Sequence, residues 1–152
     1  MWIGTPSGGD IMIDQLYHIL EQIGFAHPLH PAMTHIPMGM VMGSFVFTLS
    51  YLVLRKPDLL KTAHYCIILA LLGVVPTAVL GFMDWQYKFE GEWSGIILTK
   101  IILFFVFTFL LFITYQTGRR ENMGYMKYLV LNALLMVNAI GLGFMGGELQ
   151  YG

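Results

Sequence analysis

Three of the chain's five histidines lie within nine positions, in the stretch His27-Pro28-Leu29-His30-Pro31-Ala32-Met33-Thr34-His35, and an apolar segment follows. Imidazoles at the boundary of such a segment can bind a metal, hold a haem iron or relay protons. His27, His30 and His35 are therefore candidate cofactor ligands, and His30 and His35 are candidate metal ligands. The competing interpretation is that these histidines lie at a membrane surface and bond to headgroups, water or loop carbonyls.

The composition of the chain is that of a protein dissolved in a bilayer. Hydrophobic residues make up 57% of the 152 residues and charged residues only 11%, and the mean hydropathy is +0.68. We therefore expect membrane lipid as the surroundings. The net charge of −1 leaves no basic surface, so no nucleic-acid partner is expected. The single cysteine excludes an internal disulfide.

Apolar segments predict four membrane helices, at about 32–54, 63–83, 94–117 and 128–147. The expected fold is thus an all-α integral membrane four-helix bundle in a domain over residues 27–152. Within residues 1–26 we expect an arm and then an amphipathic helix from Asp10 to about Gln22, lying along the membrane surface or covered by a partner subunit. Pro76 predicts a kink in the second span.

The distribution of basic residues predicts the orientation. Six of the eight lysines and arginines flank the connections after the first and third spans: Arg55, Lys56, Lys61, Arg119, Arg120 and Lys127. Cytoplasmic connections carry such an excess. We therefore expect a multi-pass protein of the bacterial inner membrane with both termini in the periplasm.

This topology places three more polar residues near the histidines: Asp84, Lys100 and Glu148. Lys100 lies roughly 9 Å inside the third span, where a lysine needs a carboxylate, a water-filled cavity or a path to the surface. Asp84 and Glu148 are its candidate partners. Both could also orient a histidine or carry protons.

His64 is a further candidate ligand, with a structural or interfacial role as the alternative. It lies near the opposite membrane face, roughly 25 Å of helix from His35, so these two cannot share one iron. A haem b held by His35 must take its second ligand from another histidine of the motif, from a methionine such as Met83 or Met145, or from another subunit. No Cys-x-x-Cys-His motif for covalent haem attachment exists.

A non-haem metal is the other option for this end of the bundle. Two or three of the histidines with Asp84 or Glu148 would suit zinc or iron. The residue types alone do not decide between haem and such a metal.

Small and polar residues within the spans predict how the helices pack. The pairs Gly39 with Gly43 and Gly143 with Gly147 favour close approach of the first and fourth helices in the halves near the histidines. Asn132 and Asn138 in the fourth span are expected to form hydrogen bonds between helices.

Four sequence segments carry a resemblance to a known family: His27-Pro28-Leu29-His30-Pro31, His35-Ile36-Pro37, Gly81-Phe82-Met83-Asp84-Trp85 and Gly146-Gly147-Glu148-Leu149-Gln150-Tyr151. Together they resemble the bacterial domain-of-unknown-function family 2231 over roughly residues 27–151. The resemblance implies a four-helix inner-membrane protein, sometimes joined to Rieske or cytochrome c modules, and hence electron transfer with haem b. The family pattern has a further histidine in the third span, where this chain has Lys100. A lysine amine could replace that ligand, or the cofactor could have been lost.

The leading hypothesis is a membrane electron-transfer subunit of a larger respiratory or redox complex. It would bind haem b, or interact with quinone, near the periplasmic face, with membrane or periplasmic redox subunits as partners. Little of the chain lies outside the membrane, which favours a non-catalytic subunit over a complete enzyme. The alternatives are a non-redox anchor or assembly subunit, and a metal- or proton-handling membrane protein.

Overall fold

The computed structural model describes residues 29–88, 93–120 and 124–151, together with Met12, Ile13, Gln15, His18, Ile19 and Gln22. Side chains are described for those six residues and within 32–86, 93–120 and 124–147. Most of the arm and of the predicted amphipathic helix within residues 1–26 lies outside the described residues. That helix therefore stays a prediction.

Four long helices make up the described domain: α2 (Leu29–Leu54), α3 (Pro57–Lys88), α4 (Gly95–Gly118) and α5 (Tyr125–Tyr151). Each is long and apolar enough to cross a membrane, over Ala32–Leu54, Pro57–Gln86, Gly95–Gly118 and Tyr125–Gly147. No strand occurs among the described residues. The predicted all-α architecture with four spans is confirmed.

The second helix is longer than the predicted span over 63–83. It begins at Pro57, because proline suits the first position of a helix and Asp58 in the first turn complements the helix dipole. The turn before it is tight, since Arg55 adopts a left-handed φ of 54° and its N–H bonds to the Tyr51 carbonyl at 2.9 Å. Ser94 caps α4 by accepting a hydrogen bond from the Ile97 N–H at 3.2 Å.

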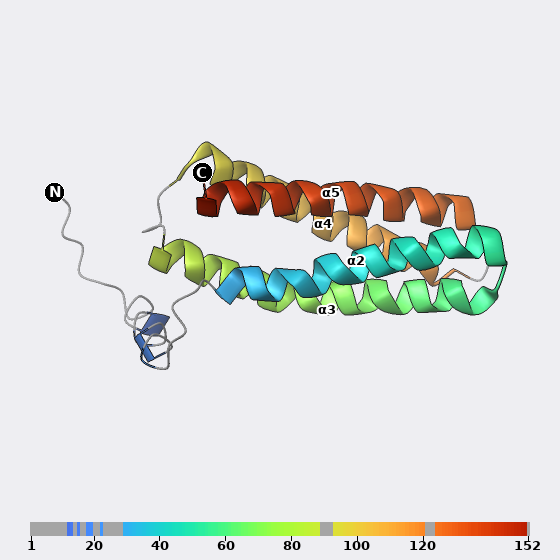
Figure 1. Cartoon of the computed structure of the whole chain (residues 1–152), viewed down its shortest axis with the longest axis horizontal. Helices are drawn as coiled ribbons and strands as arrows, with labels where there is room; N and C mark the ends of the chain where they lie inside the picture. The colour runs from blue at the N-terminus through green and yellow to red at the C-terminus, as the bar shows by residue number, and fades with distance from the viewer. Residues whose placement is uncertain are drawn as a thin grey trace.

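The helices form two hairpin pairs, α2 with α3 and α4 with α5 (Figure 1). Neighbouring helices pack in a closed ring, α2–α3–α4–α5 and back to α2, so that α2 and α4 are diagonally opposite. The two pairs diverge toward the end where α2 begins and α5 ends (Figure 1). We call this end the cavity end, and the other, which carries Arg55 and Arg119, the basic end.

The buried core is narrow and lies between the two pairs. Its members are Val41, Ala63, Ile67, Ala70, Val74, Phe107, Leu111, Tyr128, Leu135 and Ala139. Inside it, the Ser44 hydroxyl on α2 donates a 2.6 Å hydrogen bond to Asn132 Oδ1 on α5. The predicted interhelical role of Asn132 is thus confirmed. Asn138 Oδ1 is buried and finds no hydrogen-bond partner among the described residues.

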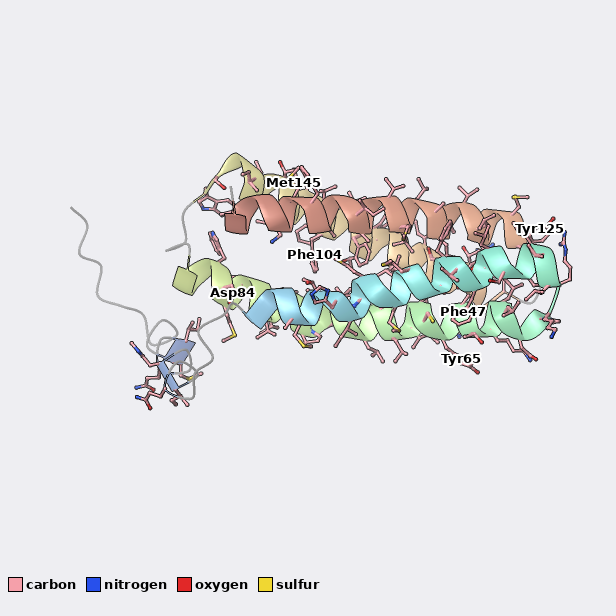
Figure 2. All side chains as sticks on the ribbon, in the orientation of Figure 1. Phe47, Tyr65, Asp84, Phe104, Tyr125 and Met145 are labelled. Atoms are coloured by element: carbon pink, nitrogen blue, oxygen red, sulfur yellow. The ribbon has the colours of Figure 1, made fainter. Side chains whose placement is uncertain are left out.

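The outer surface of the bundle is apolar along its length. Large hydrophobic side chains are exposed on all four helices, among them Leu72 at 66%, Phe109 at 65% and Val137 at 68%. Tyr65 points away from the bundle, whereas Phe104 lies between the two helix pairs (Figure 2). A belt of this kind buries its area only against lipid, so the exposed apolar surface contacts the bilayer.

Candidate functional site

A cavity of about 920 Å³ opens between the two helix pairs in the half near the cavity end. All four helices contribute to its lining, which is mainly apolar. A volume of this size lies within the range of cofactor and small-molecule sites, roughly 300–1,000 Å³. The divergence of the pairs leaves space that the side chains do not fill.

Three ionisable residues and one glycine, each on a different helix, line the cavity at similar depth. They are His35 on α2, Asp84 on α3, Lys100 on α4 and Gly146 on α5. Each is four to six residues from the end of its helix, which places them roughly 6–9 Å inside that end. His35, Asp84 and Lys100 thus line the same cavity, whereas their roles at a binding site stay a prediction.

Two features of α2 and α3 determine the position of His35. Pro37 lies inside α2 and has no N–H to bond to the carbonyl of Met33. The Thr77 hydroxyl of α3 lies 3.3 Å from that carbonyl oxygen and 2.8 Å from the Gly73 oxygen, so its proton is shared between the two helices. Gly73 permits the approach, because a Cβ there would lie 3.2 Å from the Pro37 ring. The turn of α2 that carries His35 is thereby fixed against α3.

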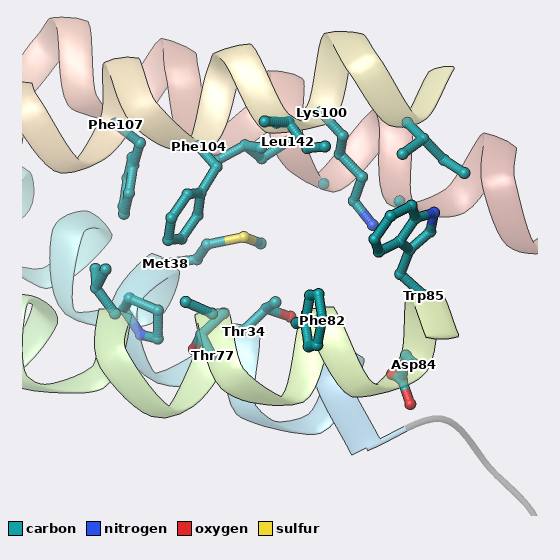
Figure 3. Close-up of a pocket in the computed structure, with 18 of the residues that line it drawn as sticks. Thr34, Met38, Thr77, Phe82, Asp84, Trp85, Lys100, Phe104, Phe107 and Leu142 are labelled. Carbon is teal, nitrogen blue, oxygen red and sulfur yellow. The ribbon is translucent and has the colours of Figure 1, made fainter. Parts of the chain in front are cut away.

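Lys100 and Asp84 form the charged part of the site. Lys100 extends from α4 into the cavity, and Asp84 lies on the opposite, α3 side (Figure 3). Asp84 is only 5% exposed, and its carboxylate acts electrostatically on Lys100. A Cβ on Gly146 would come within 3.8 Å of Lys100 Nζ, so the missing side chain leaves room beside the amine. The Asp84 carboxylate thus favours the charged form of the Lys100 amine within a largely apolar cavity.

Aromatic residues form the wall near the cavity end. Trp85 packs edge-on against Trp93 with ring centroids 5.0 Å apart, and Phe82 lies 5.9 Å from Trp85. All three line the cavity, together with Phe104, Phe105 and Phe107 deeper inside. Sequence reasoning did not select these residues. Only the fold shows that Trp85 and Trp93 line the cavity.

The glycines of α5 open the cavity more than they bring helices together. Gly143, Gly146 and Gly147 all line it. A Cβ on Gly143 would lie 3.6 Å from Met38 of α2, which supports the predicted approach of α2 and α5 at that point. A Cβ on Gly147 or Gly39 would meet nothing within 4 Å, and one on Gly43 would meet Cys66 of α3. The predicted tight glycine pairing is therefore limited to Gly143.

The structure describes only some of the other residues that were predicted to lie at the cavity end. The side chains of His27, His30 and Glu148 lie outside the described residues. Among the described side chains, no group of three histidine, cysteine or carboxylate residues could hold a metal ion. The methionine that lines the cavity is Met38, rather than Met83 or Met145. A metal site that uses His30 stays a prediction.

His64 lies in α3 near the basic end, remote from the cavity. Its ring stacks on Tyr115 of α4 with centroids 5.6 Å apart and an interplanar angle of 9°. A Cβ on Gly118 would come within 2.3 Å of His64 Nδ1, so the ring lies against the backbone of α4. Nδ1 is buried and makes no hydrogen bond within the described part of the chain. These contacts favour the packing role for His64.

Comparison with known proteins places the chain in a family. A family model of predicted membrane proteins of unknown function, DUF2231, matches residues 26–152. No curated protein and no solved structure matches the chain. The match covers all four long helices and every residue that lines the cavity. The chain therefore belongs to the DUF2231 family of predicted membrane proteins.

Proposed function

We propose that this protein is an electron-transfer subunit of a larger respiratory or redox complex in the bacterial inner membrane. Its cavity would hold haem b near the periplasmic face. The observation that carries the proposal is the juxtaposition of His35 on α2 with Lys100 on the diagonal helix α4, across one cavity of about 920 Å³.

The residues of the cavity fit a haem. His35 offers an imidazole, the usual ligand of a b-type iron. The aromatic side chains of α3 and α4 and the glycine backbone of α5 provide apolar walls against which a flat macrocycle can pack. When bound, the iron would supply one-electron transfer. The chain's own part is to position the cofactor, exclude water and stabilise its charge.

Asp84 would act on the charges of the site. Asp84 is buried, and its carboxylate favours the charged form of the Lys100 amine across the cavity. This electrostatic effect lowers the free-energy cost of keeping an ammonium inside a membrane helix. Thr34 and Thr77 add hydroxyl groups to the α2–α3 wall.

A spectrum tests the proposal. The purified chain, expressed with haem supplied, should show a Soret band, α and β bands in the reduced-minus-oxidised difference, and stoichiometric iron by metal analysis. The variant His35→Ala should lose these bands while keeping its helical content by circular dichroism.

A matched control is His64→Ala, which removes a histidine of the same domain that lies outside the cavity. This variant should keep the spectrum. Absence of any haem band and of bound metal in the unmodified chain would contradict the proposal and favour a non-redox anchor or assembly subunit. Equal loss of the haem bands in His35→Ala and His64→Ala would point to a general folding defect.

Quinone is the second candidate, because the cavity has aromatic walls inside a bundle with an apolar outer surface. Phe82 and Phe105 line the cavity and are 55% and 67% exposed. A bilayer-soluble molecule could enter between α3 and α4 at these side chains. His35 and Lys100 could then donate hydrogen bonds to quinone carbonyls. Titration with a short-chain ubiquinone, followed by quenching of Trp85 and Trp93 fluorescence, measures this directly.

A further inference from the structure

The cavity contains a cationic side chain with which an uncharged ligand would form no ionic interaction. Lys100 lines it from the second turn of α4, with its amine directed into the space between the helix pairs (Figure 3). A lysine at this depth is costly unless it meets a negative charge or water. Asp84 contributes one negative charge, from the α3 side.

The cavity wall on the α5 side of the amine is made of glycine backbone. Gly146 has no side chain, and a Cβ there would be in van der Waals contact with Nζ at 3.8 Å, so the amine lies beside bare backbone of α5. Gly143 and Gly147 extend this bare backbone wall along the cavity. An acidic group of a bound molecule can therefore approach the amine from α5, on the side away from Asp84. Such an approach limits repulsion between that acidic group and the Asp84 carboxylate, because the two would lie on different sides of the ammonium.

The rest of the lining is suited to the apolar body of the same molecule. Beyond Lys100 the wall is apolar, with Leu142 and Phe104 first and Phe107 farther along (Figure 3). The cavity extends to Val74. A ligand that fits both parts is amphiphilic, with a wide apolar portion and an acidic edge. Haem b has this form, since its two propionates lie on one edge of an apolar ring, whereas the head of a quinone carries no charge.

We propose that Lys100 is the specificity-determining residue of the cavity, binding a carboxylate of the cofactor beside Gly146 and thereby selecting haem b over uncharged ligands. This inference rests on the proposed function and makes it more specific. A charge-assisted hydrogen bond of this kind is about twice as strong as a neutral one.

Two probes that differ only in charge test the inference. Haem b and its dimethyl ester share the ring and the iron, but the ester has no carboxylates. Both are titrated into the full chain in one detergent, and the Soret band gives the two dissociation constants. Because the ester partitions differently into detergent, the quantity compared between variants is the ratio of the two constants.

The unmodified chain should bind haem b about tenfold or more tightly than the ester. In Lys100→Met, which keeps the length of the side chain without its charge, the ratio should fall to about one through weaker haem binding, with ester binding retained. Lys100→Arg should restore the preference. Gly146→Val keeps the amine but fills the space beside it, and should also lower the ratio.

Several results would overturn the inference alone. A ratio of about one in the unmodified chain, or a ratio that Lys100→Met leaves unchanged, would do so while haem binding itself persists. A similar loss of both probes in Lys100→Met, with a shifted Soret band, would show that the amine binds the iron instead. If the unmodified chain binds neither probe, the proposed function fails, and this inference fails with it.

Discussion

The Thr77 hydroxyl of α3 lies 3.3 Å from the carbonyl oxygen of Met33 in α2, the carbonyl that Pro37 cannot bond because proline has no N–H. One side chain thus compensates for a break in the hydrogen bonding of a neighbouring helix. In a bilayer no water replaces the lost bond, so the compensation carries more weight than in a soluble protein. His35 lies on the turn that this contact fixes.

Replacing Thr77 with valine should therefore destabilise the contact between α2 and α3. Valine has the same shape without the hydroxyl, and interhelical hydrogen bonds in membrane proteins contribute on average about 0.6 kcal/mol and at most about 1.7 kcal/mol. We expect a loss of this order in the free energy of unfolding, measured by denaturant titration in mixed micelles. The matched control is Thr62→Val, because Thr62 Oγ1 bonds only within α3, to the Asp58 oxygen at 2.9 Å, in an exposed position.

The background Pro37→Ala distinguishes this mechanism from a simple loss of packing. Alanine restores an N–H that can bond to the Met33 carbonyl, so Thr77→Val should cost less in that background. An equal cost in both backgrounds would show that the hydroxyl does not act on this carbonyl.

The sequence was sufficient to predict the four spans, because hydropathy determines them. Alternating topology likewise predicted that His35, Asp84 and Lys100 lie at the same end of the bundle, whereas the cavity between them was not predicted. The aromatic wall of Trp85 and Trp93 could not, since periodicity does not show which face of a helix looks toward lipid and which toward a partner.

The effect of the glycines on packing could not be predicted from the sequence either. Spacing alone suggested that Gly143 and Gly147 pack tightly against α2, whereas Gly147 has open space beside it. Whether a small residue allows contact or leaves a gap depends on how far the two helix pairs diverge. That divergence is a property of the whole bundle.

A second prediction concerns the close contact at the basic end. Gly118→Ala should be strongly destabilising, because its Cβ would lie 2.3 Å from His64 Nδ1 and 2.9 Å from Cε1. The ring cannot move away freely, since it stacks on Tyr115. We expect a loss of about 1–3 kcal/mol in unfolding free energy, the usual cost of overpacking.

The double variant with His64→Ala supplies the control for this contact. Removing the ring should restore most of the stability that Gly118→Ala loses, measured as the midpoint of thermal unfolding in detergent. If the double variant were as unstable as the sum of the two single variants, the clash would not be the cause.

The hydrogen bond between Ser44 and Asn132 gives a third prediction. Both side chains are fully buried, and the hydroxyl lies 2.6 Å from Asn132 Oδ1. In a double-mutant cycle with Ser44→Ala and Asn132→Leu, the coupling energy should be about 0.6–1.7 kcal/mol. Asn132 also donates to the Tyr128 carbonyl of its own helix at 2.9 Å, so the single Asn132 variant should cost more than the coupling alone. A coupling near zero would exclude a stabilising role for the bond.

The fourth prediction compares two glycines that have open space beside them, one that lines the cavity and one that does not. A Cβ at Gly147 or at Gly39 would meet nothing within 4 Å, but only Gly147 lines the cavity. Leucine at either position should therefore leave the helical content and the thermal midpoint of the ligand-free protein nearly unchanged. The two variants should differ in haem binding. Gly147→Leu places an isobutyl group on the cavity wall and should weaken binding at least about tenfold, measured by Soret titration, whereas Gly39→Leu should bind as the unmodified chain does. Equal binding by both variants would show that the cofactor lies elsewhere in the bundle, because a ligand between the helix pairs cannot share the space with that side chain.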